Sequence, residues 1–465
     1  MTAIRTAHTL IRLSTCVGLL ANASPLLGQT GSIAQRYRAP ADRIIDAALA
    51  DSSAYRRLAE LTDRFGPRFS GTDNLEHALD WILEEMRRDG LENVRAEPVM
   101  VPRWVRGEES AELLEPRPRR LPMLGLGGSI GTPPDGITGQ VLVVSSFDDL
   151  ARRAAEARGK IVLFNAPFTS YGRTVQYRSR GADAASRAGA VASLIRSVTP
   201  YSQQTPHTGG MSYNDSVPRI PHAALTVEDA QMLQRMQDRG QRIVARLQMS
   251  ARMLPDAPSR NVMAELRGSE RPEEVVVMGG HIDSWDVGQG AMDDGGGSVV
   301  SWEAVRLLQR LNLRPRRTVR VVLWTNEENG LRGGNAYRDA HLAEVPQHVL
   351  AMESDGGVFK PQGFGFSGSD AAFGMVQEVG RLLDRIEAGA VTRGGGGADI
   401  GPLAREGVPV MGLNVDGTRY FWYHHTDADT MDKLDQREMA LCVATMAVMA
   451  YVVADLPEVL PRAAP

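Results

Sequence analysis

Acidic side chains and histidines follow four short apolar runs of this chain, at the point where each run ends. The runs are 275–280, 319–325, 348–352 and 408–415, and the side chains that follow them are His281 and Asp293, Glu327 and Glu328, Asp355, and His424 and His425. Buried parallel strands read as continuous apolar runs, and the ligands of α/β sheets gather at the carboxyl ends of such strands. We therefore expect these side chains to converge at one edge of a sheet.

The residue types are those that bind zinc. Zinc accepts imidazole nitrogen and carboxylate oxygen, and two ions roughly 3.5–4 Å apart need a bridging ligand, for which a carboxylate with two oxygens is suited. Asp293 is the candidate for the bridge, and Asp294 with the glycines after it predicts a tight turn that brings the backbone close to the metals. Asp283, two residues beyond His281, is placed to orient that imidazole by accepting its hydrogen bond. The set predicts a two-metal hydrolytic site.

The adjacent pair Glu327 and Glu328 supplies two different functions. One carboxylate can bind a metal while the other takes a proton from the attacking water, which gives a ligand and a general base. Spacing alone does not say which glutamate has which function. It also leaves open whether His424 or His425 is the ligand.

Taken together, these motifs resemble those of the co-catalytic zinc exopeptidases, a superfamily of aminopeptidases that also contains glutamate carboxypeptidase and the transferrin receptor. The motifs in chain order are His281-x-Asp283, Asp293-Asp294-Gly295, Glu327-Glu328, Asp355 and His425-Thr426. The resemblance implies that His281 and Asp355 bind one zinc, that Glu328 and His425 bind the other, that Asp293 lies between them, and that Glu327 is the general base. It also implies a three-layer α/β/α domain around a mixed, mainly parallel sheet.

Several side chains near these ligands are candidates for a supporting or substrate-side function. His424 is left with such a function once His425 is taken as the ligand. Tyr420 and Tyr423 flank the ligand, where a hydroxyl can stabilise an oxyanion or an aromatic ring can simply pack. The glycine-rich stretch 393–397, followed by Asp399, is a flexible connector or a loop that passes close to substrate, and its position between two ligand motifs favours the second.

The predicted peptidase domain is discontinuous. Helical patterns at 41–64 and 74–88 flank a turn-rich string, and the first metal ligand arrives only at His281. Between them lies a segment with its own strand-like runs, at 139–144, 159–164, 190–195 and 220–225, and a helix at 226–239. This segment resembles the protease-associated α/β domain that members of the superfamily carry as an insert, which implies that it walls one side of the cleft; an unrelated spacer is the alternative. We predict residues 31–105 and 255–465 as the di-zinc peptidase domain and 106–254 as the insert.

The first 30 residues have the pattern of a secretory signal peptide. Arg5 and Arg12 precede a short apolar segment that ends in small residues, which predicts an exported protein, periplasmic or extracellular. A lipid anchor at Cys16 is the alternative. Removal of this segment leaves Cys442 as the one cysteine, so no intrachain disulfide forms. The apolar stretch 439–454 is shorter than the roughly 20 residues that span a bilayer, and we expect a buried C-terminal helix there instead of a stable membrane span.

Composition and charge agree with a globular enzyme. The 465 residues are 43% hydrophobic and 23% charged, and a net charge of −4 without long runs of one sign argues against a nucleic-acid partner. We predict an exported exopeptidase with two zinc ions, for which cobalt or manganese can substitute. The resemblance implies a homodimer and short peptide substrates, above all dipeptides with a free amino terminus. Another zinc amidohydrolase, a glutaminyl-cyclase-like acyl transferase and a receptor-type binding protein on the same fold are the alternatives.

Overall fold

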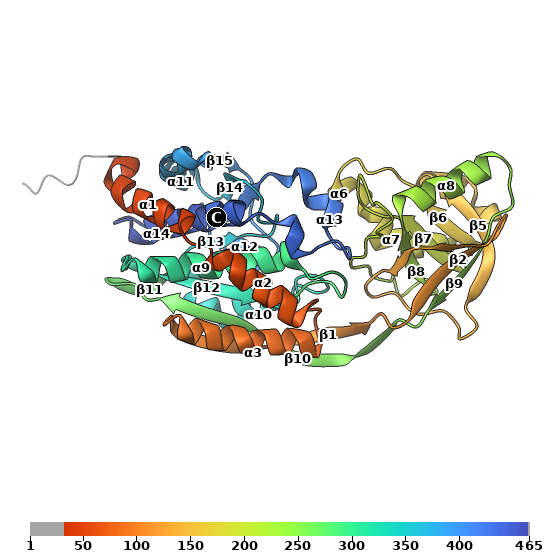
Figure 1. Ribbon diagram of the computed structural model, residues 1–465, viewed down its shortest axis with the longest axis horizontal. Helices are drawn as coiled ribbons and strands as arrows, with labels where there is room; N and C mark the ends of the chain where they lie inside the picture. Colours follow the sequence, from red (N-terminus) through yellow and green to blue (C-terminus); the bar gives the residue numbers. More distant parts are fainter. Residues whose placement is uncertain (1–31, 464–465) are drawn as a thin grey trace, which may run out of the picture.

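The computed structural model describes residues 32–463, so the predicted signal peptide and Cys16 lie outside the described residues. The chain forms two lobes, each built around an eight-stranded sheet (Figure 1). The larger lobe contains the N-terminal helices and everything after residue 252, and the smaller lobe contains the chain between them. Two long antiparallel strands, β1 (Glu92–Val105) and β10 (Arg252–Leu266), run from the larger sheet toward the smaller lobe (Figure 1).

The larger sheet is mixed: its central strands are parallel, the pairs β1–β10, β10–β12 and β14–β16 are antiparallel, and the edge pair β14–β15 is parallel. Its order is β1-β10-β12-β11-β13-β16-β14-β15, and the neighbours from β12 to β16 pair in parallel. The remaining strands are β11 (Arg271–His281), β12 (Arg317–Trp324), β13 (His348–Glu353), β14 (Pro361–Ser367), β15 (Ala390–Arg393) and β16 (Val410–Val415). Parallel central strands end on the same side of the sheet, which is the condition for their terminal side chains to meet.

Helices cover both faces of this sheet. The helices of the lobe are α1 (Ile33–Leu49), α2 (Ser53–Phe65), α3 (Asp73–Arg88), α9 (Gly296–Arg310), α10 (Arg332–Ala340), α11 (Asp370–Gly380), α12 (Gly401–Arg405), α13 (Tyr420–Tyr423) and α14 (Gln436–Asp455). Alternate residues of β11 face opposite layers, as strand geometry requires: Val276 and Met278 join the core with α9 and α14, whereas Val275 and Val277 pack with α10 and α12. The three-layer α/β fold is as predicted.

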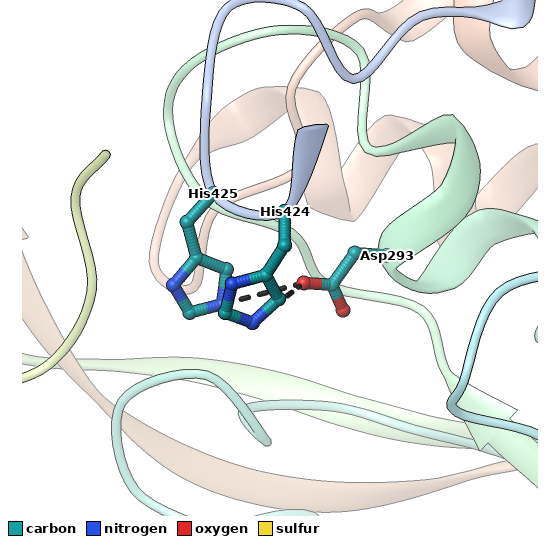
Figure 2. A group of neighbouring side chains, drawn as sticks. All are labelled: Asp293, His424 and His425. Carbon is teal, nitrogen blue, oxygen red and sulfur yellow. Dashed lines mark ion pairs between the residues drawn. The ribbon is translucent and has the colours of Figure 1, made fainter. Parts of the chain in front are cut away.

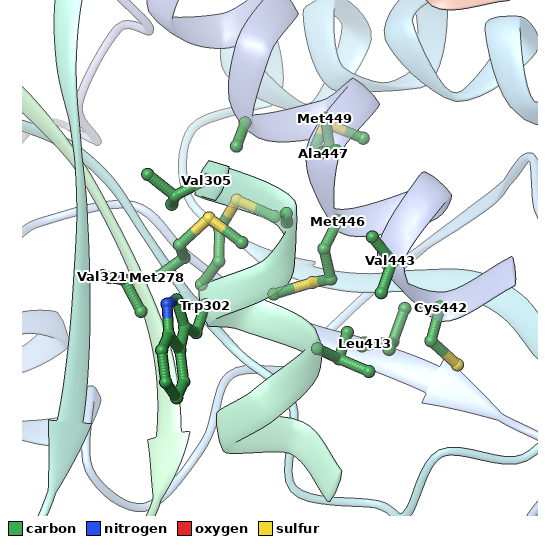
Figure 3. Close-up of a cluster of buried hydrophobic side chains, with 14 of the residues drawn as sticks. Met278, Trp302, Val305, Val321, Leu413, Cys442, Val443, Met446, Ala447 and Met449 are labelled. Carbon is green, nitrogen blue, oxygen red and sulfur yellow. The ribbon is translucent and has the colours of Figure 1, made fainter. Parts of the chain in front are cut away.

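Helix α14 lies in the core of the larger lobe. Asp435 caps it by accepting the N–H groups of Arg437 and Glu438. Figure 3 shows Met446 and Met449 of α14 facing Trp302 of α9 and Met278 of β11. Gln436–Asp455 is apolar and long enough for a membrane span, but 83% of its most apolar window is buried in the fold. The buried C-terminal helix is therefore observed, and it begins slightly before the predicted stretch.

The smaller lobe repeats the α/β arrangement on a smaller scale. Its strands are β2 (Glu109–Glu115), β3 (Arg119–Leu121), β4 (Met123–Gly125), β5 (Ile137–Val144), β6 (Ile161–Phe164), β7 (Ala192–Arg196), β8 (His222–Leu225) and β9 (Val244–Met249). Its helices are α4 (Phe147–Arg152), α5 (Ala154–Ala157), α6 (Tyr171–Thr174), α7 (Gln176–Arg187) and α8 (Val227–Asp238). All eight strands fall inside the predicted insert, 106–254, although the exact domain boundaries stay a prediction.

One predicted element differs from the structure. The helical pattern at 41–64 is divided into α1 and α2, and α1 already begins at Ile33. The division has a local cause, because the Asp51 carboxylate accepts both the N–H and the hydroxyl of Ser53, at 2.8 and 2.6 Å, and so starts a new helix. Ser32 and Gln35 form a capping box that sets the earlier start of α1.

Candidate metal centre

The predicted ligands come together at the carboxyl ends of the central strands. His281 is the last residue of β11, Glu327 and Glu328 follow β12, and Asp355 follows β13. Asp293 lies in the short turn η1 (Ala291–Gly295) that leads into α9, where its own backbone is non-helical. His425 follows α13 at the end of the loop after β16. The convergence expected from the apolar runs is thus present in the structure.

Asp293 stands between two histidine–carboxylate pairs. Its Oδ1 lies 3.3 Å from His281 Nε2, which is also 3.3 Å from Asp355 Oδ1. Its Oδ2 lies 3.3 Å from His425 Nε2, which is 3.0 Å from Glu328 Oε2. Each carboxylate oxygen of Asp293 therefore faces a different group of nitrogen and oxygen ligands, which is the arrangement that a bridging ligand requires.

Both histidines of the adjacent pair point toward Asp293 (Figure 2). His424 Nε2 is 3.5 Å from Asp293 Oδ2, and the two imidazole rings are stacked with their centroids 3.5 Å apart. His425 faces two carboxylates, whereas His424 faces only Asp293. His425 also has a left-handed backbone, with φ +61°. Because it lies within reach of both Asp293 and Glu328, His425 is better placed than His424 to share a cation with two carboxylates.

Glu327 lies at the edge of this cluster and lines the cavity in front of it. Burial raises the pKa of Glu327 well above its ordinary value, and the neighbouring carboxylates Asp355 and Glu328 act in the same direction, against the lowering effect of His281. A carboxyl group with a raised pKa is a better proton acceptor and returns the proton at near-neutral pH. Glu327 therefore remains the candidate for the general base.

The Asp283 side chain positions the main chain of Glu327 and Glu328. Asp283 contacts His281 through its main-chain carbonyl instead of through the predicted carboxylate. Nδ1 of His281 donates to the main-chain carbonyl of Asp283 at 2.9 Å, while the carboxylate of Asp283 lies 3.8 Å away. That carboxylate instead accepts the main-chain N–H groups of Glu327 at 3.1 Å and Glu328 at 3.4 Å, and the Ser70 hydroxyl at 3.3 Å. Asp283 thus orients the imidazole through its backbone and positions the turn after β12 through its side chain.

Asp294 and Asp429 hold the backbone on either side of the ligands. The Asp294 carboxylate points away from the cavity and accepts the N–H groups of His281 at 3.1 Å and Gly297 at 3.0 Å. Asp429 accepts the N–H groups of Met292 at 2.7 Å and Asp293 at 3.1 Å. Burial and the neighbouring Asp293 raise the pKa of Asp429 to about 7. The sequence analysis did not identify Asp429, because nothing local marks an aspartate that caps a turn 137 positions away.

Arg68 is a second positioning residue that the sequence analysis did not identify. It is fully buried and donates to the main-chain carbonyls of Ile282 at 2.9 Å, Gln289 at 2.8 Å and Gly290 at 2.8 Å. Burial lowers the pKa of Arg68 to about 10, while Asp429, Asp283 and Asp294 oppose that shift. The guanidinium therefore fixes the loop between His281 and Asp293 and compensates the buried carboxylates around it.

A cavity of about 850 Å³ opens in front of the cluster. Tyr420 lines it, and the site carboxylates reinforce the effect of burial in raising the pKa of Tyr420. Tyr423 is absent from the lining, because the single turn of α13 directs its ring toward Lys433. Of the two tyrosines that flank the ligand, Tyr420 lines the cavity and Tyr423 does not.

The glycine-rich stretch does not line the cavity. A side chain at Gly395 would collide with Gly365 of β14, and one at Gly397 would collide with the Glu353 carboxyl group. These glycines are needed for close packing against the sheet, so the expectation of a loop close to substrate is wrong. Asp399 is buried behind the site, where burial and Glu353 raise its pKa well above the ordinary value.

The smaller lobe forms the opposite wall of the cavity. Its lining residues include Gly127, Gly128, Tyr171, Arg178, Gly210 and Met211. Arg106, directly after β1, donates to both oxygens of Asp286, at 2.8 and 2.5 Å. Trp285 beside it packs so closely on Gly127 that any side chain there would overlap its ring. The smaller lobe is thus attached to the loop that directly follows His281.

The fold and the paired ligand groups define a metal-dependent exopeptidase. A family model described as "Peptidase family M28" matches residues 261–450. Carboxypeptidase Q of Mus musculus is 51% identical over 92% of this chain and 91% of its own length, and that of Homo sapiens is 52% identical over 89% and 88%. The chain belongs to peptidase family M28. This confirms the family predicted from the motifs, and the longer strings 279–297 and 420–425 are those that resemble carboxypeptidase Q.

Solved structures agree with this assignment. A peptidase M28 precursor from Shewanella amazonensis is 35% identical and superposes with a TM-score of 0.89, covering 93% of this chain and 99% of that one. A zinc aminopeptidase from Bacillus subtilis has the same fold at 22% identity, with a TM-score of 0.66 and coverage of 88% and 98%. Both lobes therefore have counterparts in known structures.

Proposed function

We propose that this protein is a di-zinc exopeptidase that hydrolyses short peptides, above all dipeptides with a free amino terminus. The observation that carries the proposal is the position of Asp293, whose two oxygens face two separate histidine–carboxylate pairs. In this proposal His281 and Asp355 hold one ion, Glu328 and His425 hold the other, and Asp293 bridges them.

The chemistry of the donors fits such a pair of ions. Among residues 32–463, the buried oxygens Asp293 Oδ2 and Glu328 Oε1 find no hydrogen-bond donor. Buried carboxylate oxygens without partners are costly unless they bind a cation. Nitrogen and oxygen ligands in this combination suit zinc, and also cobalt and manganese.

The chain's own residues divide the catalytic work. Zinc, when bound, supplies a Lewis acid that polarises the peptide carbonyl and lowers the pKa of water. Glu327 accepts the proton of the attacking water and returns it to the leaving amine. Asp283 and Asp429 hold Glu327 and Asp293 in position through main-chain hydrogen bonds. Tyr420 and His424 line the cavity beside the ligands, where a hydroxyl or an imidazole can stabilise negative charge on the substrate oxygen.

Short peptides are supported by the size of the cavity and by its second wall. The cavity of about 850 Å³ is of the size that encloses a small ligand, and the smaller lobe bounds it on the side away from the sheet. The relatives include proteins named as aminopeptidases and as carboxypeptidases. A dipeptide has one peptide bond, so removal of either terminal residue is the same reaction. Export of the protein and its assembly as a homodimer are further parts of the proposal.

A substrate panel tests this function. Alanyl-alanine, its N-acetylated form and a non-peptide acyl amine are incubated with zinc-loaded protein, and free amine is measured. We expect release from the unblocked dipeptide alone. Cleavage of the acyl amine in preference to the dipeptide would instead indicate an amidohydrolase of another class.

A further inference from the structure

His425 is held by the smaller lobe through its main chain. Its carbonyl accepts the N–H of Thr208 at 2.9 Å, and Thr208 lies in the loop between β7 and β8 of the smaller lobe. Among the described residues, the other four proposed ligands make no main-chain hydrogen bond to that lobe. The lobe that walls the cavity therefore also holds one of the proposed metal ligands.

The conformation of His425 makes this hydrogen bond important. Its φ of +61° lies in the left-handed region, which is unfavourable for a residue with a side chain unless the surroundings enforce it. In this conformation Nε2 faces Asp293 Oδ2 at 3.3 Å and Glu328 Oε2 at 3.0 Å. A contact that fixes the His425 carbonyl therefore also fixes the direction of its imidazole.

The helix that precedes His425 rests on the same lobe. The Phe421 ring of α13 stacks on Tyr171, with the ring centroids 5.0 Å apart, and packs against Phe168 at 5.6 Å. The hydroxyl of Thr199 donates to the Phe421 carbonyl at 2.5 Å. Because of these contacts, the loop that carries His425 follows the position of the smaller lobe.

Thr208 is itself anchored inside the smaller lobe. It is 1% exposed, and its hydroxyl donates to the Gly125 carbonyl at 2.9 Å and accepts from Nη2 of Arg106 at 3.1 Å. Beside it the N–H of Gly127 donates to the Gly209 carbonyl at 3.0 Å. Thr208 therefore presents its N–H to His425 from a fixed position.

Arg106 carries the connection to the other side of the metal centre. It directly follows β1, where the chain enters the smaller lobe, and its Nε and Nη2 donate to the two oxygens of Asp286 at 2.8 and 2.5 Å. Asp286 belongs to the loop that follows the proposed ligand His281. A continuous chain of hydrogen bonds thus runs from this loop through Arg106 and Thr208 to His425.

The relative position of the two histidines matters because Asp293 lies between them. Its Oδ1 faces His281 and its Oδ2 faces His425, both at 3.3 Å. Two ions that share a bridging carboxylate lie roughly 3.5–4 Å apart, so a displaced histidine would leave one of them short of a ligand. Contacts that hold ligands in place raise the affinity for metal.

We infer that Thr208 is a positioning residue of the metal centre, anchored by Arg106, through which the smaller lobe sets the position of His425 and the affinity for metal. The inference rests on the proposed function only in that it takes His425 as a ligand. Coupling of this kind is reciprocal, so metal binding also stabilises the contact between the lobes. The smaller lobe is then part of the metal site as well as a wall of the cavity.

Substitution of Thr208 tests the inference through zinc affinity. Thr208→Val keeps the shape and the main-chain N–H but removes the hydroxyl that contacts Arg106 and Gly125. We expect the Kd for zinc, measured by chelator competition, to rise by about 3- to 10-fold, as for the loss of one hydrogen bond. At saturating zinc, kcat for alanyl-alanine should stay within about twofold of the wild type. Thr208→Ser restores the hydroxyl and should restore the zinc affinity.

Two further variants separate positioning from a merely structural function. Thr205 lies in the same loop and is less buried, so Thr205→Val is the matched control and should bind zinc like the wild type. Arg106→Met removes the anchor, and combining it with Thr208→Val should cost less than the product of the single losses, because both act through one chain of contacts. Wild-type zinc affinity in Thr208→Val, even with a lower Tm, would overturn the inference, as would multiplicative losses in the double variant.

Hydrogen exchange of the wild-type protein tests the reciprocal effect without any substitution. The segment 204–209 contains no proposed ligand, and its Thr208 N–H is bonded across the lobes. We expect this segment to exchange at least about threefold more slowly with zinc than after chelation, whereas β5 of the same lobe should be unchanged. Equal exchange of 204–209 with and without zinc would overturn the inference even if every variant failed to fold.

These measurements distinguish the inference from the proposed function. If the wild type shows this coupling to zinc but does not hydrolyse alanyl-alanine, the proposed function fails and the inference stands. If it hydrolyses alanyl-alanine but Thr208→Val binds zinc like the wild type, the inference fails and the proposed function stands. Absence of zinc binding by the wild type would overturn both.

Discussion

Replacement of Asp429 by asparagine tests how the bridging carboxylate is held, without changing a ligand. Asp429 is buried, and its two oxygens accept the N–H groups of Met292 at 2.7 Å and Asp293 at 3.1 Å. Asparagine keeps one of these acceptors and turns an amide donor toward the other N–H. One charge-assisted hydrogen bond is lost, and two donors face each other.

The size of the effect follows from the lost hydrogen bond. A hydrogen bond to a charged group contributes about 1.5–3 kcal/mol, and each 1.4 kcal/mol is about a tenfold change in affinity. Residues that hold metal ligands in place typically change metal affinity by about 10- to 100-fold when replaced. We therefore expect Asp429→Asn to raise the Kd for zinc by about 10- to 100-fold. At saturating zinc, kcat should stay within about threefold of the wild type, because Glu327 and its contacts with Asp283 are unchanged.

Competition titration with a chromophoric chelator measures this change. Asp427 is exposed and lies two residues away, so Asp427→Asn is the matched control and should bind zinc like the wild type. Unchanged zinc affinity in Asp429→Asn would refute the claim that this carboxylate positions Asp293. An equal loss in both variants would show that the effect is not specific to the hydrogen bonds of Asp429.

Two further predictions concern the bridge and the pH dependence of stability. Asp293→Ala removes an oxygen from both ligand groups, so we expect atomic absorption to find less than one zinc per chain, and retention of two would contradict the bridging arrangement. Burial lowers the pKa of His348 to about 4, and the neutral ring donates from Nδ1 to the Glu344 carbonyl and accepts from the Tyr337 hydroxyl, both at 2.9 Å. The unfolded histidine binds a proton near pH 6.5, whereas the folded one stays neutral down to about pH 4. The contribution of His348 to the free energy of unfolding is therefore fully present above pH 6.5. About 2–3 kcal/mol of it is lost as the pH falls toward 4. Urea unfolding should show that His348→Gln loses correspondingly less free energy of unfolding than the wild type between pH 6.5 and 4. Identical pH profiles of stability for the two proteins would contradict this prediction.

The strand-end ligands and the buried C-terminal helix were predictable because their signals are local. A continuous apolar run specifies a buried parallel strand, and the residue after the run is then fixed at one edge of the sheet. His281 follows this rule directly, and Asp355 comes two residues after the end of β13. The apolar stretch 439–454 was correctly placed in the core, although α14, the helix that forms there, has 20 residues and is long enough to span a membrane.

The residues that hold the site were not predictable, because they act across long separations in the chain. Arg68 donates to a carbonyl 222 positions away, and Arg178 meets His425 across 247 positions. No periodicity or spacing records such contacts. The sequence analysis left Tyr420 and Tyr423 as equal candidates, because the direction of the single turn of α13 decides which ring faces the cavity and the sequence pattern does not contain that direction.

Glu327 provides the most direct test of the proposed chemistry. Zinc content per chain and hydrolysis of alanyl-alanine are measured side by side for the wild type and Glu327→Gln. We expect two zinc ions in both proteins and a loss of about 10²- to 10⁴-fold in kcat for the variant, since glutamine cannot accept the proton. Fewer than two ions in the wild type, or normal turnover by Glu327→Gln, would contradict the two-metal mechanism with this glutamate as its base.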